Sequence, residues 1–217
     1  IMRNVAIIQA RTGSKRLPAK VLKELEGITV LEHVVNRLRG SKRLDEIVIA
    51  TSTNNDDKRI IALAEEKEWP CFAGSENDVL KRFADAASLY GAETVIRVCA
   101  DCVFYDPKLL DKVISVYYRN GCDYATTTVK RTFPRGIAIE VLRYETLEYV
   151  EGIAKLPAHR EHMTSFVTDN LNQFRVYHFL DSSGLYDPRW RWVLDTPEDF
   201  EFASMVYSDL YRVNPMF

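Results

Sequence analysis

The chain has 217 residues, of which 47% are hydrophobic and 28% are charged, as in an ordinary globular protein with a sizeable core. Its net charge of −2 comes from 29 basic and 31 acidic side chains, so no overall basic field favours nucleic acid. No apolar run approaches the ~20 residues of a membrane span, and nothing at the start has the pattern of a signal peptide. We therefore expect a cytoplasmic protein with neither a nucleic-acid nor a membrane partner.

In chain order, short β-rich runs alternate with amphipathic helical patterns, which is typical of βαβ units and a largely parallel sheet. The first part of the chain predicts buried strands at residues 5–8, 47–50 and 94–99. Helices are predicted after each of them, with start signals at Asp56 or Asp57, in a capping box that opens at Ser75, and at Asp106-Pro107.

After about residue 122 the pattern is looser. Strands are predicted at residues 122–129, 137–142, 174–180 and 190–194, with helices at 144–154 and 158–169. A last helix is predicted to begin at Thr196-Pro197. The absence of repeats and linkers favours one domain over residues 1–217, with a doubly wound, mostly parallel α/β sheet of the kind that often binds nucleotides at its strand ends.

A basic loop, residues 11–20, lies between the first strand and the first helix. It contains four cations and no acid, and ligands of open α/β sheets bind where strands end. Gly13 and Ser14 can turn backbone N–H groups inward around an anion, while Arg11, Arg16 and Lys20 can neutralise a triphosphate. The segment is not a P-loop, because it has one glycine and lacks the Gly-Lys-Ser/Thr ending. The alternative is a solvated charged loop without a ligand.

Two aspartates follow predicted strands. Asp101 comes after the strand that ends at Cys99, and Asp195 after the one at residues 190–194. If both strands are parallel to the first, both carboxylates reach the sheet edge that carries the basic loop. Mg²⁺ is commonly held by one or two carboxylates together with phosphate oxygens and water. The alternative is a helix-capping or turn role, since Asp195 immediately precedes Thr196-Pro197.

Cys99 and Cys102 form a CxxC pair, which is a spacing found in zinc half-sites and redox pairs. No second pair accompanies it, and Cys99 ends an apolar run. We therefore favour a packing role for both thiols over metal or redox chemistry.

Several segments, taken together, resemble the cytidylyltransferases that make CMP-activated acidic sugars, in particular the branch called spore coat polysaccharide biosynthesis protein F. The first and last of these segments are the most specific, and all occur in the order found in that family. They read ARTGSKRLPAKVL at 10–22, ATS at 50–52, GSENDVLKRF at 74–83, ADC at 100–102, FPRG at 133–136, REH at 160–162 and VLDTPEDF at 193–200.

The resemblance implies CTP as donor, a sugar as acceptor, Mg²⁺ as cofactor and a homodimer. It implies attack of a sugar hydroxyl on the α-phosphorus, with pyrophosphate leaving. The residues that match the family's metal ligands are Asp101 and Asp195, and Arg11 and Lys20 match residues that grip the phosphates. The nucleotide-binding set it implies is Ala10, Arg11, Gly13, Ser14, Arg16, Lys20, Ser52, Ser75 and Arg82, and the acceptor-binding set is Arg135, Glu140 and His162.

The chain departs from that family at two places that we expect on the acceptor side. Val103-Phe104-Tyr105 replace a segment with Pro and Leu, and Ala138 stands where an acid is common. Two other functions therefore remain possible: a glycosyltransferase that uses a ready-made nucleotide sugar, and a nucleotide-binding module without turnover. The first usually carries two aspartates that flank one residue, whereas this chain has Asp101 alone at that strand end.

Overall fold

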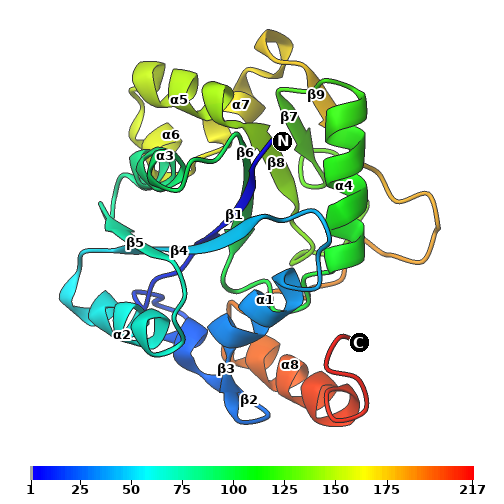
Figure 1. The fold of residues 1–217 in the computed structure, drawn as a ribbon. Coiled ribbons are helices and arrows are strands. Elements are labelled where there is room, and N and C mark those ends of the chain that lie inside the picture. The colour runs from blue at the N-terminus through cyan, green and yellow to red at the C-terminus, as the bar shows by residue number, and fades with distance from the viewer. Residues whose placement is uncertain (1) are drawn as a thin grey trace.

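The computed structural model describes residues 2–217, and its centre is a seven-stranded sheet (Figure 1). The order across the sheet is β5-β4-β1-β6-β8-β7-β9. Its strands are β1 (Asn4–Gln9), β4 (Glu46–Ser52), β5 (Cys71–Gly74), β6 (Thr94–Cys99), β7 (Tyr124–Thr126), β8 (Glu140–Arg143) and β9 (Val176–His178). All neighbours pair in parallel except β8, which runs against both β6 and β7. The predicted mostly parallel α/β sheet is confirmed.

Helices cover both faces of this sheet (Figure 1). One face packs against α1 (Val30–Leu38), α2 (Lys58–Glu66) and α4 (Pro107–Arg119). The other packs against α3 (Val79–Leu89), α5 (Tyr144–Ile153) and α7 (Ser165–Asp169), with α6 (Pro157–Glu161) beside α3. The last helix, α8 (Pro197–Leu210), lies against a small hairpin of β2 (Glu24–Leu25) and β3 (Ile28–Thr29). Three short 3₁₀ helices are η1 (Lys20–Leu22), η2 (Asn55–Asp57) and η3 (Leu171–Gln173).

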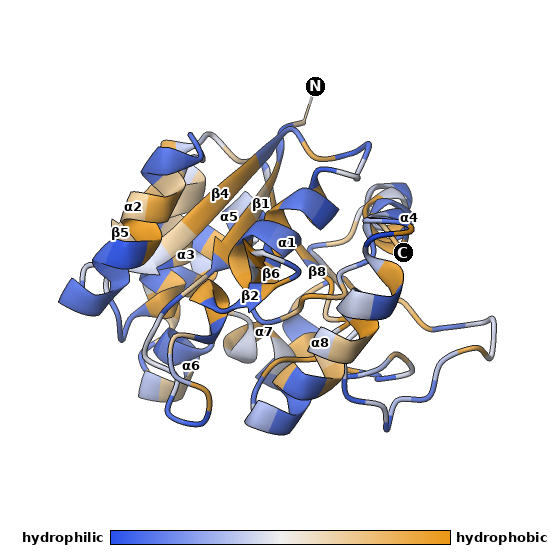
Figure 2. Ribbon diagram, turned by 90° about the horizontal axis from the view of Figure 1, so that it is seen from below, coloured by the Kyte–Doolittle hydropathy of each residue, from blue (hydrophilic) through white to orange (hydrophobic). Residues whose placement is uncertain are grey.

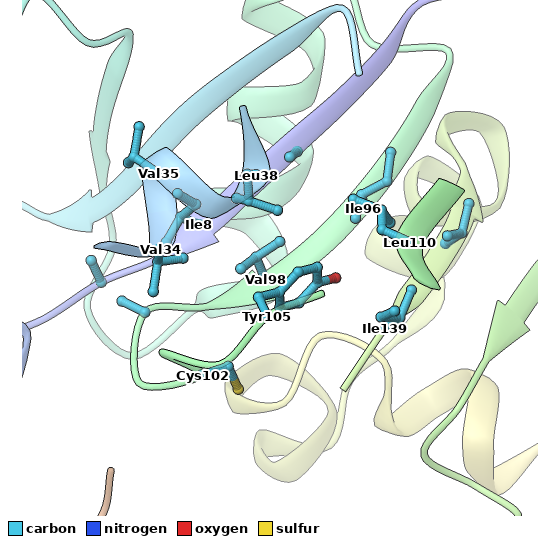
Figure 3. Packing of buried hydrophobic residues seen from close by; sticks show 14 of the residues in the cluster. Ile8, Val34, Val35, Leu38, Ile96, Val98, Cys102, Tyr105, Leu110 and Ile139 are labelled. Atoms are coloured by element: carbon cyan, nitrogen blue, oxygen red, sulfur yellow. The ribbon is translucent and has the colours of Figure 1, made fainter. Parts of the chain in front are cut away.

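The core forms because the central strands are apolar on both faces, as buried parallel strands are. Figure 2 shows β1, β4 and β6 in hydrophobic colours and the outer faces of the helices in hydrophilic ones. Ile8 and Val98 face the helix layer of α1 and α4, where they meet Val34 and Leu110 (Figure 3). Each such buried side chain contributes ~1.5–3 kcal/mol of transfer free energy.

The structure corrects four predictions of local structure. The predicted helix at 158–169 is two helices, α6 and α7, separated at residues 162–164. No strand forms at 190–194, where one parallel bridge joins Arg191 to Arg135. The strands predicted at 122–129, 137–142 and 174–180 shorten to β7, β8 and β9. Ser75 does not cap α3, because Asp78 is the N-cap and accepts from the Lys81 N–H at 2.9 Å.

Two predicted helix starts are confirmed. Asp106 caps α4 with Pro107 in the first turn, and Thr196 caps α8 in a full capping box with Asp199. Among residues 2–217, the helices are too short or too polar to cross a membrane.

Candidate active site

The basic loop leaves the carboxyl end of β1, and its shape is set by one backbone carbonyl. The oxygen of Thr12 accepts from the N–H of Ser14 at 2.8 Å and from the N–H of Ala19 at 3.0 Å. Ala19 has a left-handed backbone with φ of 50°, which turns the chain into η1 at Lys20. The loop is thereby closed on itself, and its other cations, Arg11, Lys15 and Arg16, stay exposed.

The two predicted aspartates converge on one cation. The Lys20 Nζ atom lies 2.6 Å from Asp101 Oδ2 and 3.0 Å from Asp195 Oδ1. Arg16 Nη2 is 3.3 Å from the other oxygen of Asp195. The structure thus brings together a lysine that we expected on phosphate and two carboxylates that we expected on a metal.

Asp195 lies at this edge of the sheet although residues 190–194, directly before it, do not form a strand. The N–H of Leu194 donates to the carbonyl of Asp101 at 3.0 Å, which ties the two aspartate segments together. Asp199 Oδ2 accepts from the N–H of Asp195 at 2.9 Å and from that of Thr196 at 3.0 Å. Thr196 and Asp199 therefore perform the capping that was the alternative role for Asp195, and the Asp195 carboxylate faces Lys20.

The two cations Lys20 and Arg16 balance the charges of the two aspartates. Burial disfavours the Lys20 ammonium, but the adjacent carboxylates of Asp101 and Asp195 outweigh burial and raise the pKa of the Lys20 amine above its usual value. The amine is therefore charged at neutral pH, and together with Arg16 it offsets two carboxylates that would otherwise repel each other.

These groups line one cleft of about 570 Å³, a volume typical of ligand sites. Of the predicted nucleotide-binding residues, Arg11, Gly13, Ser14, Arg16 and Lys20 line it, as do both aspartates. A larger, mostly apolar groove of about 780 Å³ lies between α4 and α8, and its lining includes none of the predicted site residues.

Four predicted nucleotide-binding residues do not line the cleft. Ala10 and Arg82 are each 1% exposed, and Ser52 is fully buried. The Ser52 hydroxyl donates to Asp57, and Arg82 Nη1 donates to the carbonyl of Ser75 at 2.6 Å. Ser75 itself is exposed. Arg82 thus fixes the backbone next to Glu76, which lines the cleft, and Ser52 reaches the basic loop only through Asp57.

The predicted acceptor residues are spread over three elements. Arg135 is exposed on a turn, and His162 is exposed where α6 ends. Glu140 is only 2% exposed, and its two oxygens are bound by the Arg97 guanidinium and the Tyr124 hydroxyl. Burial opposes ionisation of Glu140, yet Arg97 and Tyr124 outweigh it and lower the pKa of this carboxyl.

The turn that carries Arg135 requires its glycine. Gly136 has φ of +107°, and an added Cβ would lie 2.2 Å from the carbonyl oxygen of Trp192. Hydrogen bonds from Arg135 N–H to Trp190 O (2.9 Å) and from Trp192 N–H to Arg135 O (2.6 Å) fasten this turn to the segment that leads to Asp195.

The segments that depart from the family pattern pack in the interior. Val103 and Phe104 pack with Tyr207 of α8, and Tyr105 joins the core beside α1 and α4. Val103 and Tyr105 are almost fully buried, while Phe104, at 9% exposure, also lines the groove between α4 and α8; that this departure affects the acceptor stays a prediction. Cys102 is buried at the edge of the apolar cluster that contains Val98 and Tyr105 (Figure 3), and both thiols of the CxxC pair are free.

Sequence reasoning missed three features of the site. Glu76 and Glu161 line the cleft; both lie in segments that resemble the family, but neither was predicted as a site residue. The Arg160 Nη2 atom lies 2.6 Å from Asp78 Oδ2 and 2.7 Å from Glu151 Oε1, so Arg160 joins α6 to the start of α3 and to α5. Asp57 binds the basic loop, where the sequence suggested only a helix cap.

Comparison with known proteins identifies the family of this chain. Residues 5–213 match the model of the family described as cytidylyltransferase. The chain is 34% identical over 206 residues to the spore coat polysaccharide biosynthesis protein SpsF of Bacillus subtilis, covering 93% of this chain and 85% of that protein.

Solved structures share the fold. A cytidylyltransferase from Leptospira borgpetersenii superposes with a TM-score of 0.91 at 30% identity, over 99% of this chain and 96% of that one. A CMP:2-keto-3-deoxy-manno-octonic acid synthetase, solved in complex with CTP, gives a TM-score of 0.69 at 17% identity, over 95% of this chain and 99% of its own. The chain belongs to the cytidylyltransferase family.

Proposed function

We propose that this protein transfers CMP from CTP to a hydroxyl of a sugar and releases pyrophosphate, in the synthesis of a surface polysaccharide or glycoconjugate. The observation that carries the proposal is the convergence of Asp101 and Asp195 on the Lys20 ammonium, inside a cleft whose rim holds Arg11 and Arg16. Family membership supports a cytidylyltransferase reaction, and the neighbour solved with CTP supports CTP as the nucleotide.

The residues present fit Mg²⁺. Asp101 and Asp195 offer hard carboxylate oxygens around one point that a cation, the Lys20 ammonium, already occupies. Residues 2–217 contain no cluster of three or more such ligands, so the triphosphate and water would complete the coordination. When bound, the ion would neutralise phosphate charge and align the α-phosphate for displacement. Lys20 would then turn from the carboxylates to a phosphate oxygen.

The basic loop binds the phosphates of the nucleotide and stabilises the leaving group. Arg11 and Arg16 bind the β- and γ-phosphates and stabilise the negative charge that accumulates on pyrophosphate as it leaves. The backbone N–H of Gly13 holds the same phosphates, whereas the N–H of Ser14, which was expected to do so, donates instead to the carbonyl of Thr12. The sugar hydroxyl oxygen forms its bond to the α-phosphorus and loses its proton to water, while the bond between the α-phosphorus and the bridging oxygen breaks in line and its electron pair leaves with pyrophosphate.

An acidic sugar is the acceptor class that the residues favour. Arg131 and Arg135 are both exposed, and they lie close enough that Arg135 adds to burial in lowering the pKa of Arg131. Two neighbouring guanidinium groups attract a carboxylate. His162 and Arg135 would contact the acceptor, whereas Glu140, bound to Arg97, would hold the floor of that region.

Titration calorimetry with CTP, with and without Mg²⁺, tests the nucleotide site. We expect CTP to bind in a Mg²⁺-dependent way and UTP to bind more weakly. Absence of binding by every nucleoside triphosphate would refute the proposed site. Binding of CTP without product from any sugar would identify a non-catalytic nucleotide-binding module instead.

We further propose that residues 1–217 act as one domain. We also propose that the chain forms a homodimer, and light scattering would test this oligomeric state.

A further inference from the structure

Asp57 holds the basic loop from beneath. Its Oδ1 atom accepts from the Thr12 N–H at 2.7 Å and from the Thr12 hydroxyl at 2.8 Å. Its other oxygen accepts from the hydroxyl of Ser52, at the end of β4. Asp57 is 2% exposed, Thr12 is 9% exposed and Ser52 is fully buried, so water does not compete for these bonds.

The position of Asp57 makes this contact unexpected. Asp57 is the N-cap of α2, where an aspartate normally accepts from its own helix and contributes ~1 kcal/mol. Here its side chain makes no capping hydrogen bond. The carboxylate instead crosses to a loop 45 residues earlier in the chain. Local helix stability therefore does not explain its orientation.

Thr12 transmits this contact to the rest of the loop. Its N–H and hydroxyl are fixed by Asp57, while its carbonyl receives the N–H groups of Ser14 and Ala19. Arg11 directly precedes Thr12, and Lys20 directly follows Ala19. A single buried carboxylate thus sets the orientation of both ends of a loop whose cations would otherwise repel one another.

We infer that Asp57 is a positioning residue of the nucleotide site, which holds Thr12 so that the basic loop is preorganised for the triphosphate. This inference rests on the proposed function, in which the loop binds CTP. Preorganisation improves binding because the ligand does not have to order the loop itself.

The test compares Asp57→Ala with Asp56→Ala, which removes the same charge from the exposed neighbour. Hydrogen bonds to a charged group contribute enough that we expect Asp57→Ala to weaken CTP binding by about tenfold to a hundredfold. The KM for the sugar should stay within about twofold, whereas general loss of structure would affect both substrates. Unchanged CTP affinity in Asp57→Ala would overturn the inference.

Two further variants keep the test informative if Asp57→Ala folds poorly. Asp57→Asn retains an oxygen for Thr12 and should restore most of the CTP affinity. Thr12→Val removes the hydroxyl but keeps the N–H, and should weaken CTP by a smaller factor. In the double variant Asp57→Ala/Thr12→Val, the Thr12 change should have almost no additional effect. Additive losses, or an Asn variant as weak as the Ala variant, would contradict the inference.

A readout without nucleotide separates this inference from the proposed function. Trypsin can cut at Lys15 and Arg16, which are exposed in the loop. Asp57→Ala should be cut there several-fold faster than the wild type, and Asp56→Ala at the wild-type rate. If the wild type binds no CTP, the proposed function fails, yet this cleavage still decides whether Asp57 holds the loop. Equal cleavage of both variants would overturn the positioning role.

Discussion

The two halves of the sheet use charge in opposite ways. In the N-terminal half (β5, β4, β1 and β6), charged groups gather at the strand ends and line an open cleft with Lys20, Asp101 and Asp195. In the C-terminal half (β8, β7 and β9), Glu140 is buried in the sheet and bound by Arg97 and Tyr124. An open charge remains available to a ligand, whereas a buried pair is committed to the fold.

This difference teaches where substitutions should separate function from stability. Asp101 and Asp195 retain 22% and 23% side-chain exposure, so they can be replaced without an uncompensated buried charge. Glu140 cannot. Four expected outcomes test the contrast, in order of decreasing size.

The largest effect is expected from Asp101→Ala or Asp195→Ala. Each substitution removes a carboxylate of the proposed metal site. Because a bound metal ion supplies several kcal/mol of charge stabilisation in the transition state, we expect turnover to fall roughly a thousandfold. The thermal midpoint should change little. Steady-state kinetics and calorimetric melting check both statements, with Asp85→Ala, whose side chain is 42% exposed, as control. Full activity in either variant would remove the assignment.

Glu140→Ala should reverse that pattern. It leaves the largely buried Arg97 without its partner, so we expect a loss of ~3–5 kcal/mol in unfolding free energy, measured with urea. The folded-state pKa of Glu140 lies below its ordinary value of 4.5, so its contribution is present above pH 4.5 and is lost as the pH falls below it. The difference between wild type and Glu140→Gln should therefore shrink in acid. A loss of less than ~1 kcal/mol in unfolding free energy would show that the pair of Glu140 and Arg97 does not stabilise the fold as proposed.

Arg11→Ala and Lys20→Ala should each weaken CTP by about tenfold to a hundredfold, because each removes a charge-assisted contact to phosphate. Added salt should reduce the loss of CTP affinity more in Arg11→Ala than in Lys20→Ala, because salt screens exposed charges such as Arg11. Calorimetric titration measures it, with the exposed Arg39→Ala as control. Wild-type affinity in Arg11→Ala would exclude the basic loop from the nucleotide site.

The smallest effect is expected from Thr196→Ala. It removes the N-cap of α8 and should lower the unfolding free energy by ~1 kcal/mol. Because Asp199 of the same capping box also holds the Asp195 N–H, turnover should fall modestly as well. A stability loss without any change in turnover would show that the box does not position Asp195.

The same contrast explains what the sequence could predict. Strands β1, β4 and β6 and the caps of α4 and α8 follow from local patterns, namely apolar runs and an Asp or Thr before Pro. The parallel order of those strands then implies that the basic loop and Asp101 share one edge. Such signals require no knowledge of distant partners.

The remaining features depend on contacts between distant residues. Asp195 arrives beside Asp101 through one hydrogen bond from Leu194, not through the predicted strand. Glu140 looked like a polar position on a strand, and only the register that places it beside Arg97 reveals a buried pair. Asp57 looked like an ordinary helix cap because its partner, Thr12, lies 45 residues away.

The central claim is best tested by pyrophosphate release from each of the four nucleoside triphosphates, with Mg²⁺ and a panel of acidic and neutral sugars. We predict release with CTP and one acidic sugar, and loss of that release in Asp101→Ala. Release with another triphosphate in place of CTP, or none with any sugar although CTP binds, would contradict the account.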